Sequence, residues 1–107
     1  MPYFLSLLFI LLFSLLSAKE NKFDPQRLTA TTLITDLNRP MELEVSPDGR
    51  IFFIELDGAF KVFMPETQKV IKIKKFDVAR RGEVGLIGLA LDPNFKNNNW
   101  VYLQYSP

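Results

Sequence analysis

Residues 42–76 read ELEVSPDGRIFFIELDGAFKVFMPETQKVIKIKKF, a stretch in which short β-rich runs alternate with turn motifs. The runs cover residues 42–46, 50–56, 59–64 and 70–76. Between them stand Pro47-Asp48-Gly49, Asp57-Gly58 and Pro65-Glu66-Thr67. Such combinations of Pro, Asp and Gly are typical of tight turns, and Asp-Gly is a strong signal for a two-residue hairpin. The stretch therefore predicts an all-β fold with four consecutive, short, antiparallel strands.

The same pattern begins again further along the chain. LEVSPD at 43–48, followed by IFFI at 51–54, is echoed by LALDPN at 89–94, followed by VYL at 101–103. The two prolines of these segments lie 46 residues apart. A four-stranded unit that repeats about every 40–50 residues is typical of the blades of a β-propeller. Two unrelated hairpins that share one kind of turn are the alternative.

An apolar segment precedes the β region. Residues 3–18 (YFLSLLFILLFSLLSA) carry no charged side chain and are fewer than the roughly 20 residues that span a bilayer as a helix. Small residues and then charge follow, which favours a secretory signal cleaved after Ala18. We expect a signal helix over 1–18, an extended lead-in over 19–32 and a secreted or periplasmic product. An uncleaved membrane anchor is the alternative.

The β region, 33–107, holds fewer strands than a closed propeller needs. A propeller closes with about 4–8 blades, whereas these residues account for a first blade and the start of a second. The last strand, 100–107 (WVYLQYSP), is apolar and has no following partner in the sequence. We therefore expect a partial propeller domain, the N-terminal portion of a longer protein. A stand-alone β protein of 89 residues that covers this edge by self-association is the alternative.

The composition excludes several classes of function. Thirteen Lys and Arg against twelve Asp and Glu leave a net charge of +1, which gives no indication of a nucleic-acid partner. The absence of Cys excludes disulfides, thiolate metal sites and a Cys nucleophile. The absence of His removes the commonest general base and the commonest transition-metal ligand. The chain therefore binds something or holds only part of an active site.

The region from Arg81 to Tyr105 carries a family resemblance. The segment EVGLIGLALDPNF at 83–95, a short Asn-rich loop and WVYLQYS at 100–106 resemble the soluble glucose/sorbosone dehydrogenases, which are quinone-dependent aldose dehydrogenases. The upstream segments LNRP at 37–40, SPDGRIFF at 46–53 and ELDG at 55–58 are similar to the first blade of that family. The resemblance covers about 33–107.

The resemblance implies a six-bladed propeller with its active site at the mouth of the central channel. There, pyrroloquinoline quinone lies over Ca²⁺, and a His takes a proton from the sugar as hydride moves to the quinone. Glu83 stands where characterised sugar dehydrogenases have a Gln that contacts the cofactor, so Glu83 is the candidate cofactor-binding residue. A carboxylate there would repel an anionic quinone unless it is protonated or paired. The resemblance implies that the catalytic His, the Ca²⁺ ligands and the basic cofactor clamps lie beyond Pro107.

Other residues have both a functional and a structural interpretation. Arg80 and Arg81 could hold an anion but are more often solvated. Gly85 and Gly88 could suggest a phosphate loop, although close backbone packing explains them better because no helix follows. Asp92 with Asn94 could bind Ca²⁺, although a self-bonded Asp-Pro-Asn turn is simpler.

Two larger sets of side chains are expected to be structural. Lys69, Lys72, Lys74 and Lys75 indicate a solvated outer strand. The aromatic set is expected in the core between blades rather than as a platform for sugars, and comprises Phe52, Phe53, Phe60, Phe63 and Trp100.

Two functions from different classes follow. The first is the N-terminal portion of an exported quinone-dependent aldose dehydrogenase, whose full-length form acts on a sugar or another polyhydroxyl molecule. This chain alone should be inactive, and within it we expect no catalytic residue and no metal ligand. The second is a non-catalytic extracellular propeller module that binds carbohydrate or a protein partner.

Overall fold

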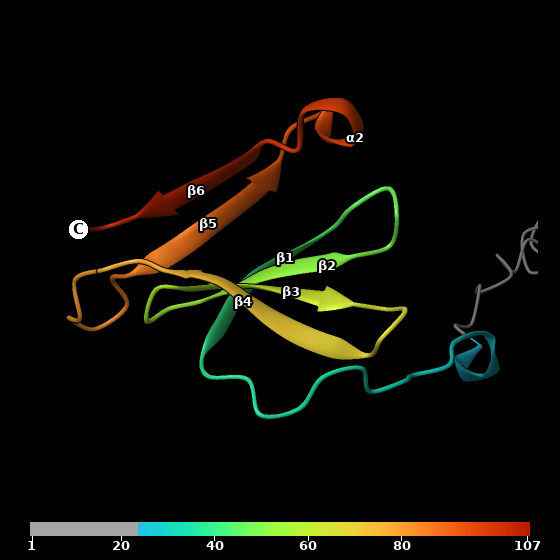
Figure 1. Ribbon diagram of the computed structural model, residues 1–107. Helices are drawn as coiled ribbons and strands as arrows, with labels where there is room; N and C mark the ends of the chain where they lie inside the picture. The colour runs from blue at the N-terminus through green and yellow to red at the C-terminus, as the bar shows by residue number, and fades with distance from the viewer. Residues whose placement is uncertain (1–23) are drawn as a thin grey trace, which may run out of the picture. The chain divides into compact units, whose positions relative to one another are not determined.

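The computed structural model describes residues 24–107 (Figure 1). The predicted signal segment 1–18 and the first part of the lead-in lie outside the described residues. Within the lead-in, a single 3-10 turn, η1 (Pro25–Arg27), is capped by Asp24, whose carboxylate accepts the Gln26 N–H at 2.9 Å. Residues Thr32–Pro107 form one compact unit. Among residues 24–107, no helix has the length and apolar character to cross a membrane.

The compact unit begins with a four-stranded antiparallel meander, as the sequence predicts (Figure 1). Its strands are β1 (Pro40–Val45), β2 (Ile51–Glu55), β3 (Ala59–Met64) and β4 (Lys69–Lys75), paired in that order. The turns lie where the Pro, Asp and Gly motifs stand. Gly49 and Gly58 both have positive φ, 87° and 105°, which glycine adopts without strain. This sheet has the architecture of one propeller blade.

A second, two-stranded sheet pairs β5 (Leu86–Leu91) with β6 (Val101–Tyr105) in antiparallel fashion. The Asn-rich segment between them, expected to be a loop, contains one helical turn, α2 (Phe95–Asn98). Asn99 ends this turn in the left-handed conformation, and its N–H donates to the Phe95 carbonyl at 2.8 Å. The pair β5–β6 is the start of the second blade.

The hydrophobic core lies between the two sheets and joins them into one unit. Strand β1 runs beside β5, and the Glu42 carboxylate accepts the Leu89 N–H at 3.3 Å across this junction. The buried core residues are Phe52, Ile54, Phe60, Val62, Val78, Leu86, Leu89 and Phe95. Neighbouring blades of a propeller are expected to place their first strands side by side and to pack apolar side chains between their sheets. The contact between β1 and β5 has this form.

The aromatic prediction is confirmed for Phe52 and Phe60, which lie in the core between the two sheets, and wrong for Trp100. Phe53 and Phe63 are buried as well, but they are not part of that core. Trp100 keeps 61% of its surface exposed, because it lies in the link from α2 to β6 and no described element packs over it.

Strand β4 is exposed along its whole length, which agrees with the prediction from its lysines. Its apolar side chains are not covered either, and Ile71 and Ile73 are about half exposed. The pairing of β4 with β3 is irregular, because Phe60 pairs with Lys74 and Lys61 with Lys72. This β-bulge leaves Ile73 without a directly opposed partner.

Candidate functional site

The predicted cofactor residue, Glu83, lies in a tight turn of the connection from β4 to β5. The turn is closed by the Val84 N–H, which donates to the Arg81 carbonyl at 3.0 Å, and Gly82 within it has a φ of 57°. The Glu83 side chain is exposed and makes no ion pair or hydrogen bond within the described part of the chain. Its role in binding a cofactor stays a prediction.

A cavity of about 360 Å³ lies beside this turn, where three connecting segments meet at one end of the first blade. We call it the end pocket. Its lining comes from the entry to β1, the β2–β3 turn and the β4–β5 connection, and comprises Asn38, Arg39, Leu56, Asp57, Ala79, Arg80, Gly82 and Val84. Of the predicted residues, the structure brings Arg80 into this lining; Arg81 and Glu83 are its neighbours in the turn.

Arg39 links two walls of the end pocket. Its backbone has a φ of 51°, and its carbonyl accepts the Leu56 N–H at 3.0 Å, which ties the entry of β1 to the β2–β3 turn. Its side chain reaches the other wall, where Nη2 donates to the Gly82 carbonyl at 3.3 Å. The guanidinium is therefore held in place although it remains at the surface.

A buried ion pair next to the end pocket fixes the wall that carries Arg39. Glu55, at the end of β2, is only 2% exposed. One carboxylate oxygen lies 2.5 Å from the Lys61 ammonium, and the other accepts the Asn38 N–H at 2.6 Å. Since Asn38 precedes Arg39, this carboxylate fixes the backbone that carries the Arg39 side chain.

The third wall is fixed by a close approach of backbones. The Leu86 N–H donates to the Leu56 carbonyl at 3.0 Å, and a Cβ on Gly85 would lie 2.1 Å from that same oxygen. A Cβ on Gly88 would lie 2.9 Å from Cβ of Gln104 on β6. Close packing, rather than a phosphate loop, is thus confirmed for both glycines.

The charges around the end pocket are not balanced. Its one carboxylate, Asp57, is paired with Lys75 at 2.5 Å, and this hydrogen bond holds the pKa of Asp57 below its ordinary value. Among residues 24–107, none of Arg39, Arg80 and Arg81 forms an ion pair with a carboxylate. The end pocket therefore has an excess of positive charge.

The second acidic candidate is a structural turn. The Asp92 carboxylate accepts the Asn94 N–H at 2.8 Å and the Asn98 side-chain amide at 3.0 Å. The Tyr102 hydroxyl also donates to it at 2.5 Å, which is the main cause that lowers the pKa of Asp92 and raises that of Tyr102. The described residues contain no group of three or more acidic or His side chains placed to hold a metal ion.

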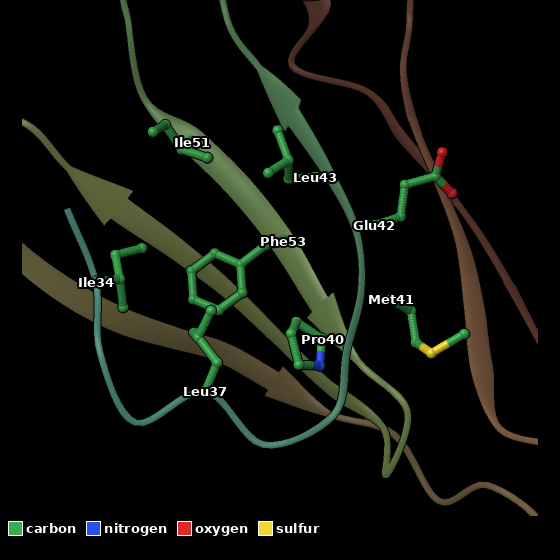
Figure 2. A pocket seen from close by; sticks show the side chains of 8 residues that line it. All are labelled: Ile34, Leu37, Pro40, Met41, Glu42, Leu43, Ile51 and Phe53. Atoms are coloured by element: carbon green, nitrogen blue, oxygen red, sulfur yellow. The ribbon is translucent and has the colours of Figure 1, made fainter. Parts of the chain in front are cut away.

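A different cavity, of about 340 Å³, lies on the face of the first blade that is turned away from β5 (Figure 2). Phe53 lies at its centre, with Ile34 and Leu37 of the segment before β1 beside it, as Figure 2 shows. Its lining is almost entirely apolar, with Glu42 as the one charged member, and Glu42 is directed toward β5. Such a surface suits packing against another element better than binding a sugar.

Sequence reasoning missed most of the end pocket. The sequence presents Asp57 only as a turn residue, and Arg39 only as part of the segment LNRP at 37–40 that resembles the first blade of the family. Glu55 and Lys61 stand in strands whose apolar neighbours set the pattern. The only feature of the sequence that could have indicated the ion pair is that Glu55 and Lys61 are charged residues at positions that alternation assigns to a buried face.

Comparison with known proteins assigns most of the chain to one family. The model of the family "Glucose / Sorbosone dehydrogenase" matches residues 37–107. Quinoprotein glucose dehydrogenase B of Acinetobacter calcoaceticus is 30% identical over 90 residues, which cover 80% of this chain and 18% of that protein. The Hedgehog-interacting protein of Mus musculus is 28% identical over 88 residues, 74% of this chain and 13% of that protein. The human form is 29% identical over 83 residues, with coverages of 69% and 12%.

A solved structure agrees with the sequence matches. The crystal structure of an oxidoreductase (glucose dehydrogenase) from Thermus thermophilus superposes with a TM-score of 0.63 at 32% sequence identity. The match covers 68% of this chain and 22% of that one. The chain thus spans less than a quarter of the length of each of these relatives.

Proposed function

Because the chain belongs to the glucose/sorbosone dehydrogenase family, we propose that it forms the opening part of an exported, quinone-dependent aldose dehydrogenase. The observation that carries this proposal is the match of the family model to residues 37–107, almost the whole of the compact unit. The similarity to quinoprotein glucose dehydrogenase B adds the cofactor class, and the apolar segment at residues 3–18 adds export.

In this proposal the chain supplies one wall of the active site. The turn that carries Glu83 and the end pocket beside it would face the mouth of the channel, where the quinone binds in the family. The end pocket suits part of such a ligand, because Arg39 and Arg80 present guanidinium groups and its one carboxylate is neutralised by Lys75. Glu83, on the exposed turn beside the end pocket, would be one of the residues that contact the cofactor.

Other parts of the site must come from elsewhere. The described residues offer no cluster that suits Ca²⁺, and the sequence has no His to take a proton from a sugar hydroxyl. When bound, the quinone would accept the hydride, so this chain's own part is to bind and orient. We therefore propose that residues 1–107 by themselves do not turn over sugar.

A non-catalytic function is the second candidate, and one observation favours it. Two of the matched relatives are Hedgehog-interacting proteins, whose name denotes a protein partner rather than a reaction. Glu83 in place of the Gln of sugar dehydrogenases points the same way, since its carboxylate would oppose an anionic cofactor. In that case the chain would open an extracellular propeller that binds a protein or a carbohydrate.

The two functions differ in one experiment. The native protein, purified from the exported fraction of its source, is incubated with pyrroloquinoline quinone, Ca²⁺ and a panel of aldoses, and reduction of a dye is followed. We expect aldose-dependent reduction that requires added quinone. A protein that binds the quinone or a sugar yet never reduces the dye would instead support the non-catalytic module.

A further inference from the structure

We propose that Arg39 and Arg80 form a carboxylate-binding subsite in the end pocket, a role in addition to the cofactor clamps that the family resemblance places beyond Pro107. The subsite deepens the proposed function, since its ligand would be carried either by the quinone cofactor or by an acidic sugar. Both sources present the same chemical group, a planar carboxylate, which matches the fork of a guanidinium.

The first support is the charge balance. Arg39 and Arg80 both line the end pocket, and two like charges around one cavity repel unless a negative charge lies between them. In the end pocket, Asp57 is already paired with Lys75, and neither Arg39 nor Arg80 has a carboxylate partner among the described residues. An entering carboxylate would supply the missing negative charge.

The second support is the number of free donors. A guanidinium has five N–H donors, and Arg39 uses one of them on the Gly82 carbonyl. Within residues 24–107 the Arg80 side chain makes no hydrogen bond to the protein, and it lines the same cavity of about 360 Å³. The donors left over are enough for a bidentate contact from one arginine and a second contact from the other.

The third support is preorganisation. Arg39 is held by its carbonyl to Leu56, by its side chain to Gly82, and through Asn38 to the buried carboxylate of Glu55. A side chain that is already ordered loses less conformational entropy on binding. The buried Glu55 carboxylate thus helps to fix the backbone next to Arg39 before any ligand is present.

The test measures binding rather than turnover. Native-length protein is purified without quinone, and isothermal titration calorimetry gives the Kd for pyrroloquinoline quinone, for glucuronate and for neutral glucose. Arg39→Gln and Arg80→Gln should each weaken binding of at least one carboxylate ligand by about tenfold or more, the loss typical of a charge-assisted hydrogen bond. Binding of glucose should change by less than about twofold, since it carries no charge for a guanidinium to pair.

Arg81→Gln is the matched control, because it removes the same charge from the neighbouring position outside the pocket lining. If it weakens binding as much as the other two variants, the effect is general surface charge and the subsite is overturned. Unchanged Kd values for both carboxylate ligands, or no binding of either by the unaltered protein, overturn it as well. If Arg39→Gln loses its circular dichroism spectrum, the exposed loop residue Arg80 decides the question.

The titrations with the two carboxylate ligands also identify which molecule supplies the carboxylate. A loss confined to the quinone assigns it to the cofactor, and a loss confined to glucuronate assigns it to the sugar. Carboxylate binding that depends on Arg39 and Arg80 in a protein without dye reduction would keep the subsite and reject the enzymatic function. Dye reduction with arginine-independent binding would do the reverse.

Discussion

The buried pair of Glu55 and Lys61 makes a sharp prediction about stability. In Lys61→Met the ammonium is lost, and the Glu55 carboxylate, which lies 2.5 Å from it, remains in a position that is 2% exposed. Only the Asn38 N–H would still bond to that carboxylate. A buried charge that has lost its partner is costly, so we expect the variant to be clearly less stable.

The magnitude follows from the geometry. At 2.5 Å and an effective dielectric constant of about 20, the attraction between the two charges is about 7 kcal/mol before the cost of desolvation is subtracted. Measured losses on removing one partner of a buried pair are about 3–5 kcal/mol. The Lys61 side chain is 21% exposed, so water reaches it in part and we expect a loss near the lower limit, about 3 kcal/mol.

The assay is urea unfolding of the purified native protein, followed by far-ultraviolet circular dichroism. Lys72→Met is the control, because Lys72 stands opposite Lys61 in the β-ladder but is exposed, and its loss should cost about 0.5 kcal/mol or less. The double variant Glu55→Gln and Lys61→Met should recover most of the loss, since no unpaired charge then remains. If Lys61→Met unfolds at the same urea concentration as the control, Glu55 is not an essential support of the end pocket.

Two further predictions concern the same end of the blade. Gly58→Ala should cost about 3–5 kcal/mol of folding stability, because φ is 105° and the new Cβ would lie 2.2 Å from the Phe76 carbonyl oxygen. Gly82→Ala should cost only about 1–2 kcal/mol, because its φ is 57° and the new Cβ would lie in open space. Thermal unfolding compares the two variants, and equal losses of stability would contradict the geometry. The Asp57–Lys75 hydrogen bond lowers the folded-state pKa of Asp57, so the pair stabilises the fold above the unfolded pKa of about 3.9, and this contribution is lost as pH falls through the folded value. Urea midpoints between about pH 2 and 6 should therefore depend less on pH in Asp57→Asn than in the unaltered protein; identical pH profiles would show that the pair contributes nothing.

The blade was predictable because its signals are local. Pro47-Asp48-Gly49 and Asp57-Gly58 fix the turns through the conformations that Gly and Pro adopt, and alternation fixes the strands between them. The repeat around Pro47 and Pro93 then indicated a second blade. Alternation also places Phe60 and Val62 on one face of their strand, and that face lies in the core.

The structure differs from the sequence-based predictions where contacts between several residues determine the local conformation or the burial of a side chain. The turn of helix α2 forms because the Asp92 carboxylate collects donors from Asn94, Asn98 and Tyr102, which composition alone does not reveal. Trp100 is exposed because no described element covers it, and apolar character gives no information about that.

The end pocket was out of reach of sequence reasoning for a related reason. Arg39, Asp57 and Arg80 come from segments far apart in the chain, and only the meander brings them together. Glu83 and Arg80 could be singled out from the sequence through the family resemblance and the charge of their loop. Their partner Arg39 required the hydrogen bond to Gly82, which only the structure gives.

We propose that these strands begin a larger propeller whose remaining blades complete the site. The intact mass of the native protein, recovered from outside the cytoplasm of its source, tests this most directly. We expect a species several times heavier than 12.4 kDa that lacks the segment up to Ala18. A species slightly lighter than 12.4 kDa would contradict it, because a chain of that size has no His and too few strands to close a propeller.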